Sequence, residues 1–446
     1  MARDLKGNVF GNPHSASPSS TLATQRIDDA RLKALAFFKA SPEHFDIVFV
    51  QNATAAIKLV ADGLVDYASQ RSKTLWYGYH AAAHTSLVGV RELASGGSRC
   101  FMNDGAVEDW IVQRGLRHWD HDGLQNDKVE MFAYPAQSNM NGRRLPLSWS
   151  GKLRDATQDT KQETYVLMDA SALCTTAQLD LSDHKTAPDF VALSFYKIFG
   201  YPDLGALIVR KSSGHVLTGR RYFGGGTVDM VTVEEKEQQS WHATKREALH
   251  EALEDGTPPF HSIIALATAI DIHLKLFRSM NHISSYTTQL AKVLYTGLSG
   301  LTYSNGVNLC EIYKDPLSMY GDATTQGPTI AFNVKRSDGT YIGKSVVEQL
   351  AISEGIHLRT GGVCNPGGVV AALSLSPKEM RENYEEGLRC GNGIDELNGK
   401  PTGIVRVSLG AMSNVNDVKK LLGFMARFVR PVQPLIMPSK EIALLG

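Results

Sequence analysis

The sequence is poor in cysteine and carries no excess charge of either sign. Lys and Arg together number 46, as do Asp and Glu, so there is no global basic field to attract nucleic acid or an acidic membrane surface. The five cysteines are an odd number without metal-site or disulfide spacing, which suits a reducing compartment: Cys100, Cys174, Cys310, Cys364 and Cys390. We therefore expect no nucleic-acid partner, no metal and no disulfide framework.

Targeting and repetitive segments are also lacking. Residues 1–7 carry charges and glycine where a secretory signal needs an apolar core, and no later stretch is expected to reach membrane-spanning length. The sequence has no internal repeat and no low-complexity segment. These absences predict a cytoplasmic protein without a membrane partner.

The sequence does have enough apolar content for a large core, together with an alternation of strands and helices. With 446 residues and 43% hydrophobic content, one large domain and one smaller domain are expected. From residue 46 to about residue 210, β-rich runs alternate with amphipathic stretches, the pattern of a doubly wound, mainly parallel sheet. The predicted strands are 46–50, 74–79, 129–134, 165–168, 190–194 and 206–210.

The rest of the chain predicts a smaller α+β domain. Long helices are predicted at 261–280 and 283–298, bridging the two domains. Beyond residue 325 we predict strands at 329–334 and 404–409 and helices at 341–353, 376–388 and 416–428. The fold class is therefore α/β. Its predicted parts are a large domain (1–265, with residues 1–40 as a segment able to pack on the small domain), a small carboxyl-terminal domain (266–430) and a loosely held tail (431–446).

Two of the predicted strands end in a single ionisable residue. Asp169 follows the apolar run 165–168, and Lys197 follows the run 190–196. Because the carboxyl ends of parallel strands meet at one crevice, we expect an acid and an amine there. A pyridoxal phosphate site is built this way: the lysine bonds to the aldehyde and the carboxylate keeps the pyridine nitrogen protonated. The alternative, a turn-starting Asp and a solvated lysine, holds for most isolated pairs.

Other predicted strands also end in polar residues. Asn52, Ala53 and Thr54 precede an apolar-patterned helix whose positive end could hold a phosphate, although a simple N-cap is the alternative. His84 could stack on a cofactor ring, although a lone histidine proves nothing. Asn139 could bind a ring oxygen, although Ser-Asn-x-x-Gly is also a common turn. Five strands are thus expected to supply one site.

Three residues of the predicted small domain suggest substrate chemistry. Arg406 lies in an alternating strand, where its forked guanidinium suits a substrate carboxylate, and Arg359 offers a second such group. An exposed strand arginine is the alternative. Cys364 lies in a glycine-rich loop after an arginine, which suits a mobile nucleophilic thiolate, with a free thiol in a turn as the alternative.

Two glycine and hydroxyl segments, 223–227 and 254–257, could approach a phosphate closely. They contain Gly226, Thr227 and Thr257. Without further evidence each segment is only a loop.

With these residues identified, the chain resembles the class V (NifS-like) pyridoxal phosphate enzymes, and within them the amino-terminal sulfurase domain of eukaryotic molybdenum cofactor sulfurases. The resemblance runs in order from about residue 11 to about residue 428 and implies the type I fold of pyridoxal phosphate-dependent transferases. The matching stretches are Gly11-Asn12-Pro13-His14-Ser15, His84-Thr85-Ser86-Leu87-Val88-Gly89, Tyr134-Pro135-Ala136-Gln137-Ser138-Asn139, Ser194-Phe195-Tyr196-Lys197-Ile198-Phe199-Gly200, Tyr222-Phe223-Gly224-Gly225-Gly226-Thr227, Leu358-Arg359-Thr360-Gly361, Cys364-Asn365-Pro366-Gly367 and Arg406-Val407-Ser408.

The resemblance implies a role for each candidate residue. Lys197 would bond to the cofactor, Asp169 would contact its pyridine nitrogen, and His84 would stack on its ring. Asn139 would lie near the ring oxygen, and Cys364 would carry a persulfide. The substrate would be bound by Arg406, on its carboxylate, together with Arg359 and Asn139. The remaining implied cofactor-binding residues are Ala53, Thr54, Ser194, Tyr196, Gly226, Thr227 and Thr257, the last reaching across from the second subunit of a homodimer.

The implied activity is that of a cysteine desulfurase or sulfurtransferase. Sulfur from L-cysteine would pass to Cys364 and then to an unidentified acceptor, with release of L-alanine. A C–S lyase or another β-elimination enzyme of specialised metabolism is the alternative that keeps the cofactor. A non-catalytic binding homologue is the alternative of another class.

Overall fold

A seven-stranded sheet forms the centre of the large domain. The structure is a computed structural model that describes residues 2–116, 127–158, 160, 162–233 and 240–429. The sheet runs in the order β1-β7-β6-β5-β4-β2-β3. Its strands are β1 (Phe45–Val50), β2 (Thr74–His80), β3 (Ser98–Phe101), β4 (Lys128–Pro135), β5 (Glu163–Asp169), β6 (Phe190–Ser194) and β7 (Gly205–Arg210).

The strand directions agree with the predicted sheet. Pairing is parallel from β6 through β5, β4 and β2 to β3, whereas β7 is antiparallel to both of its neighbours. All six predicted strands are present. The edge strand β3 was not predicted, because its four residues are mostly polar and exposed and lack an apolar pattern.

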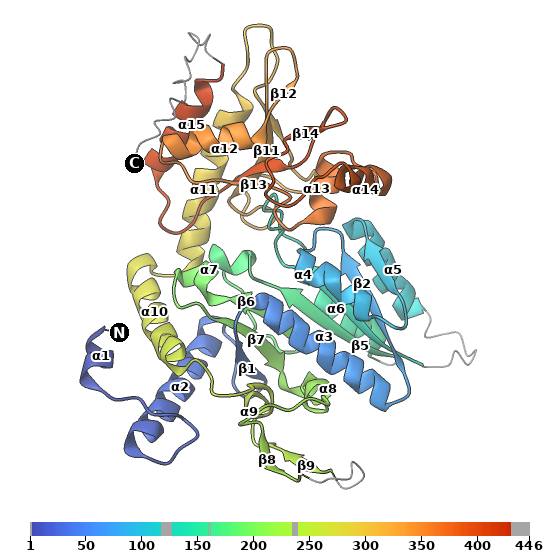
Figure 1. The fold of residues 1–446 in the computed structure, drawn as a ribbon, viewed down its shortest axis with the longest axis vertical. Coiled ribbons are helices and arrows are strands. Elements are labelled where there is room, and N and C mark those ends of the chain that lie inside the picture. Colours follow the sequence, from blue (N-terminus) through green and yellow to red (C-terminus); the bar gives the residue numbers. More distant parts are fainter. Residues whose placement is uncertain (1, 117–126, 159, 161, 234–239, 430–446) are drawn as a thin grey trace, which may run out of the picture.

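Helices cover both faces of this sheet (Figure 1). Alternation along β5 sends Val166 and Met168 into one core and Tyr165 and Leu167 into the other. The first core is closed by α2 (Pro18–Phe37), α5 (Asp104–Leu116), α6 (Trp149–Thr157) and α10 (Phe260–Phe277), and the second by α3 (Ala53–Gln70) and α8 (His215–Thr218). Burial on both faces explains the nearly continuous apolar runs of the central strands.

The second domain contains an antiparallel sheet in the order β10-β11-β16-β13, with β12 also paired to β11. These strands are β10 (Cys310–Ile312), β11 (Thr329–Lys335), β12 (Tyr341–Ile342), β13 (Arg359–Gly361) and β16 (Ile404–Ser408). The helices α11 (Met280–Ser299), α12 (Lys344–Ser353) and α15 (Val415–Ala426) pack on it around Phe332 and Val405. The predicted helix 341–353 therefore begins later than expected, because its first two residues pair with β11.

The remaining elements are short, and several lie beside the predicted site. They are α1 (Ala2–Gly7), α4 (Thr85–Val88), α7 (Phe195–Phe199), α9 (Leu249–Leu253), α13 (Pro366–Ala372), α14 (Pro377–Glu385), β8 (Val228–Val231), β9 (His242–Thr244), β14 (Glu396–Leu397) and β15 (Lys400–Pro401). The predicted tail at 431–446 lies outside the described residues.

The helix α10 corrects one sequence expectation. It is 18 residues long and, among the described residues, is the one helix long and apolar enough to cross a membrane. Its contacts are nevertheless with protein: Asp271 pairs with Lys33 of α2, and His273 lies against Phe37 and Phe199. The predicted boundary at residue 265 falls inside α10, and the amino-terminal segment packs on this helix through α2.

Candidate active site

Asp169 and Lys197 lie at the carboxyl ends of neighbouring parallel strands. Asp169 ends β5 opposite Ala192 of β6, and Lys197 lies in α7, which begins directly after β6. Asp169 is 9% exposed, and its carboxylate accepts the Ser171 N–H at 2.9 Å. The Lys197 side chain is exposed and has no hydrogen bond or ion pair within the described part of the chain. A buried, hydrogen-bonded acid and an exposed amine therefore follow adjacent strands.

The His84 ring is close enough to both groups for their charges to act on it. Burial lowers the pKa of His84 from its ordinary value, while the Asp169 carboxylate opposes this shift and the Lys197 ammonium adds to it. The ring Nδ1 accepts the Ser86 N–H at 3.1 Å at the start of α4. The imidazole is therefore mostly neutral at pH 7, and the acid, the amine and the ring lie near one another at the strand ends, a group of residues that we call the crevice.

Hydroxyl groups gather beside this crevice at the first turn of α3. Thr54 Oγ1 and Ser86 Oγ lie 2.7 Å apart, and the Ala53 N–H donates to Ser194 Oγ at 3.1 Å. Asn52 is the N-cap, since its side chain accepts the Ala55 N–H. The N-cap interpretation is thus correct for Asn52, and it leaves the Thr54 and Ser86 hydroxyls at the positive end of an 18-residue helix.

The turn that carries Cys364 is docked onto the same loops of the large domain. The Thr85 N–H donates to the Cys364 carbonyl at 2.9 Å, and Asn139 Nδ2 donates to the Val363 carbonyl at 2.7 Å. Val363 and Cys364 have φ angles of +43° and +54°, a region that non-glycine residues seldom occupy. The Cys364 side chain remains exposed. The turn is therefore held by its backbone while its thiol faces solvent.

The two predicted substrate arginines stand opposite each other on paired strands. Arg359 of β13 is the register partner of Arg406 of β16. Arg406 donates to the Asn139 carbonyl at 2.7 Å, and its Nε is buried without a hydrogen-bond partner among the described residues. Burial lowers the pKa of Arg406, the Arg359 charge lowers it further, and Cys364 acts in the opposite direction. An anion bound between the two guanidinium groups would offset both the desolvation of Arg406 and its repulsion by Arg359.

Among the five thiols, only Cys364 combines exposure with this position. Burial raises the pKa of Cys310 to about 12 and also raises the pKa values of Cys100 and Cys174. Cys390 is exposed in the loop after α14. The structure therefore favours Cys364 as the nucleophile.

The glycine and hydroxyl segments form a separate cluster. Gly226 and Thr257 line an open pocket of about 730 Å³ together with His14 and Lys245. The Thr227 hydroxyl is fully buried and bonds the Gly224 carbonyl, so it braces this loop. The adjoining strands β8 and β9 lie at the end of the large domain away from the second domain (Figure 1). Within one chain, these residues do not join the Lys197 crevice. The predicted cofactor-binding residue Tyr196 directly precedes Lys197, and its side chain is 36% exposed.

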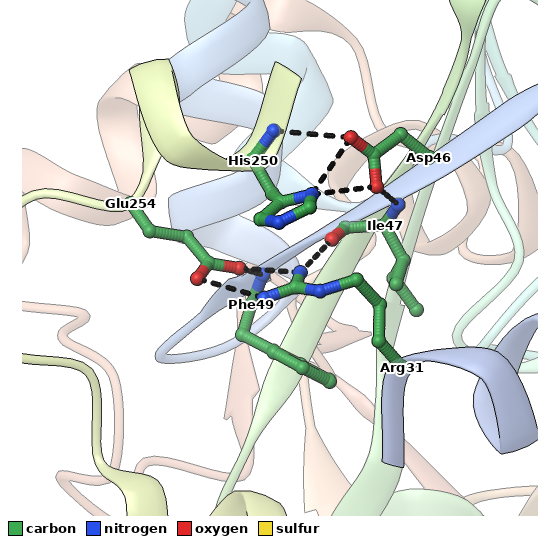
Figure 2. Close-up of polar contacts among 6 residues, drawn as sticks. All are labelled: Arg31, Asp46, Ile47, Phe49, His250 and Glu254. Atoms are coloured by element: carbon green, nitrogen blue, oxygen red, sulfur yellow. Dashed lines mark hydrogen bonds and ion pairs between the residues drawn. The ribbon is translucent and has the colours of Figure 1, made fainter. Parts of the chain in front are cut away.

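A buried polar network holds the segment that leads to Thr257 (Figure 2). Glu254 accepts hydrogen bonds from the Arg31 guanidinium at 2.8 and 3.1 Å and from the Phe49 N–H at 2.7 Å. Arg31 also donates to the Ile47 carbonyl. Two outward backbone groups of the edge strand β1, the Ile47 carbonyl and the Phe49 N–H, are thereby bonded by side chains, as a further strand would otherwise do.

Sequence reasoning missed two residues of the crevice, Ser86 and Asn365. Ser86 lies two residues after His84, so its place after β2 was the available signal. Asn365 follows Cys364 and precedes Pro366-Gly367, a pattern that indicates the start of a helix. That Asn365 also contacts the large domain has no local sequence signal.

Comparison with known proteins agrees with this arrangement. A family model described as aminotransferase class-V matches residues 3–421. The chain belongs to this family. A molybdenum cofactor sulfurase of Aspergillus fumigatus is 53% identical over 448 residues, which cover 100% of this chain and 52% of that protein. The chain therefore spans about half the length of the curated relatives it matches.

Solved class-V structures share the fold. The apo cysteine desulfurase of Thermococcus onnurineus NA1 superposes with a TM-score of 0.66 at 19% identity, covering 93% of this chain and 86% of that one. A cystine C–S lyase, C-DES, in complex with its product cysteine persulfide, gives a TM-score of 0.63 at 14% identity, covering 96% and 92%. The predicted class-V membership and fold are thereby confirmed.

Proposed function

We propose that this chain is a pyridoxal phosphate-dependent cysteine desulfurase that passes sulfur from L-cysteine to Cys364. One observation carries the proposal: the Asp169 acid, the Lys197 amine and the His84 imidazole lie close enough for their charges to interact, and the Cys364 turn is docked beside His84. A lyase needs the first three groups but has no use for an exposed thiol fixed beside them.

The residues fit the chemistry of the cofactor. Lys197 offers an unpaired amine for the aldehyde, and Asp169 offers a buried carboxylate for the pyridine nitrogen. The Thr54 and Ser86 hydroxyls at the start of α3 suit the phosphate. When bound, pyridoxal phosphate supplies an electron sink for the pair released at the substrate α-carbon.

The chain's own residues then account for the reaction. Arg406 would bind the substrate carboxylate, and the Lys197 amine, when free, would remove the α-proton. The Cys364 thiolate attacks the substrate sulfur, so an S–S bond forms as the Cβ–S bond breaks. L-Cysteine and one enzyme thiol thereby give L-alanine and one enzyme persulfide; both sulfur atoms are oxidised and the β-carbon is reduced.

Partners and location belong to the same proposal. The Thr257 pocket does not include Lys197 among its lining residues, which supports a homodimer in which each chain lends that pocket to the other. The names of the relatives favour the molybdenum cofactor as the final destination of the sulfur. The balanced charge and the scattered cysteines support a cytoplasmic location.

The test is to incubate the cofactor-loaded protein with L-cysteine and to measure four products: alanine, persulfide on Cys364, pyruvate and ammonia. We expect alanine and persulfide in equal amounts. Cys364→Ala should abolish sulfur transfer while keeping the cofactor absorbance and the borohydride labelling of Lys197. Pyruvate and ammonia that persist in Cys364→Ala would establish a lyase instead. A colourless, unlabelled wild-type protein would establish a non-catalytic homologue.

A further inference from the structure

Asn365 is a fully buried amide with every polar atom of its side chain engaged. Its Oδ1 accepts the Gly368 N–H at 2.9 Å, which caps α13. Its Nδ2 donates to the Ala82 carbonyl at 2.9 Å and to Asn139 Oδ1 at 2.8 Å. A residue of the second domain thus bonds two loops that follow strands of the large sheet.

The hydrogen bond from Asn365 to Asn139 is part of a set of bonds that attach the cysteine turn, residues 363–365, to the large domain. Because Asn139 Oδ1 accepts from Asn365, the Asn139 amide nitrogen is directed at the Val363 carbonyl, 2.7 Å away. The Thr85 N–H holds the Cys364 carbonyl between these two attachments. All three residues of the turn, Val363 to Asn365, are therefore bonded to the large domain.

The turn needs such attachments because its backbone is strained. Val363 is β-branched and still has a φ of +43°, and Cys364 follows it at +54°. The approach of the two domains is also close, since a Cβ at Gly367 would lie 2.2 Å from the Ala81 carbonyl oxygen. A strained backbone of this kind is retained only where several surrounding interactions hold it in place.

We propose that Asn365 is a positioning residue that sets the reach of the Cys364 thiol, acting through Asn139. The Asn139 amide nitrogen donates to the Val363 carbonyl, so when Asn365 orients Asn139 it also positions the backbone next to the thiol. This inference rests on the proposed function of Lys197 and Cys364.

Two substitutions separate the helix cap from the docking. Asn365→Asp keeps an oxygen that caps Gly368 but replaces both donors with a carboxylate that repels the Ala82 carbonyl and Asn139 Oδ1. Asn365→Ala removes both functions. The matched control is Asn414→Ala, which removes the N-cap of α15 and touches none of these loops.

We expect both Asn365 variants to label at Lys197 with borohydride as the wild type does and to exchange the substrate α-proton with deuterated solvent within about twofold of its rate. Persulfide formation on Cys364 should fall by about tenfold or more in kcat, with KM changed by less than about twofold. Sulfur transfer at the wild-type rate in Asn365→Asp, an equal loss in Asn414→Ala, or a parallel loss of α-proton exchange would overturn the assignment.

Thiol alkylation gives a readout that does not depend on turnover. Iodoacetamide modification of Cys364, measured by mass spectrometry against Cys390 as an internal standard, should speed up by about fivefold in both Asn365 variants as the turn is released. An unchanged ratio of Cys364 to Cys390 modification would contradict the docking role of Asn365. If the ratio changed while the wild type formed no persulfide, the docking would stand and the proposed function would fail.

Discussion

Arg31 and Glu254, 223 positions apart, form a two-bond ion pair against the outward edge of β1 (Figure 2). Their side chains are 7% and 10% exposed. Glu254 is followed by Asp255, which accepts hydrogen bonds from Arg220 and from the Gly224 N–H. The carboxylates of Glu254 and Asp255 thus attach the chain to two different segments just before Thr257. The Arg31–Glu254 ion pair therefore helps to position Thr257, the predicted phosphate contact.

Removing Glu254 should destabilise the protein strongly. Glu254→Ala leaves the Arg31 charge buried and the Phe49 N–H without a partner, so the free energy of unfolding should fall by about 3 kcal/mol. Urea titration measures the change. Lys33→Ala, which breaks the exposed Lys33–Asp271 pair, is the control and should change it by less than about 1 kcal/mol. Equal losses in the two variants would contradict the account of the network.

The neighbouring Asp46–His250 pair should make stability depend on acid pH. Burial raises the pKa of Asp46, but the hydrogen bonds and charge of His250 outweigh it, so the folded pKa lies below the usual 3.8. A group with a depressed folded pKa stabilises the fold above its unfolded pKa and loses that contribution as pH falls through the folded value. The stabilisation is therefore complete above about pH 4.

The measurement for this pair is urea unfolding between pH 6 and pH 3. The wild type should lose more stability across this range than Asp46→Asn, whose side chain does not titrate. The other carboxylates titrate in both proteins and cancel in the comparison. Parallel curves for the two proteins would show that the pair adds no pH dependence.

The sequence contained enough information to predict the crevice but not the contacts that complete it. Asp169 and Lys197 end runs that are apolar over their whole length, and such burial is a local property of the sequence. Strands of two or three residues, such as β10, β12 and β13, are too short to show a period. Arg31 and Glu254 carry no pattern that pairs them.

The contacts of Asn365 and Ser86 illustrate the same limit. Each is a short polar side chain at the start of a short helix, and its partner lies in a segment far away in the sequence. The separation of Thr257 from Lys197 within one chain also depends on how the segments are arranged in space. Motif order alone does not specify it.

The charges around His84 should be measurable in the cofactor-free protein. Lys197→Ala removes a positive neighbour and should raise the pKa of His84, whereas Asp169→Asn removes a negative one and should lower it. In the wild type the pKa should lie below the usual 6.5 because of burial. Titration of the His84 imidazole by NMR gives all three values. Shifts in the same direction in both variants would mean that the three groups do not share a crevice.

The hydroxyl pair at the start of α3 predicts a specific loss of cofactor affinity. Thr54→Val keeps the shape of the side chain but removes one donor of the Thr54–Ser86 pair, and Ser86→Ala removes the other. Each change should raise the dissociation constant for pyridoxal phosphate by about tenfold, because it removes about the binding free energy of one hydrogen bond to a charged group. Absorbance titration of the cofactor-free protein measures the constant. Thr287→Val removes a buried hydroxyl from α11 in the second domain and should leave the affinity unchanged. Since Thr54→Ser retains the donor, it should bind like the wild type, and a loss as large as that of Thr54→Val would place the phosphate elsewhere.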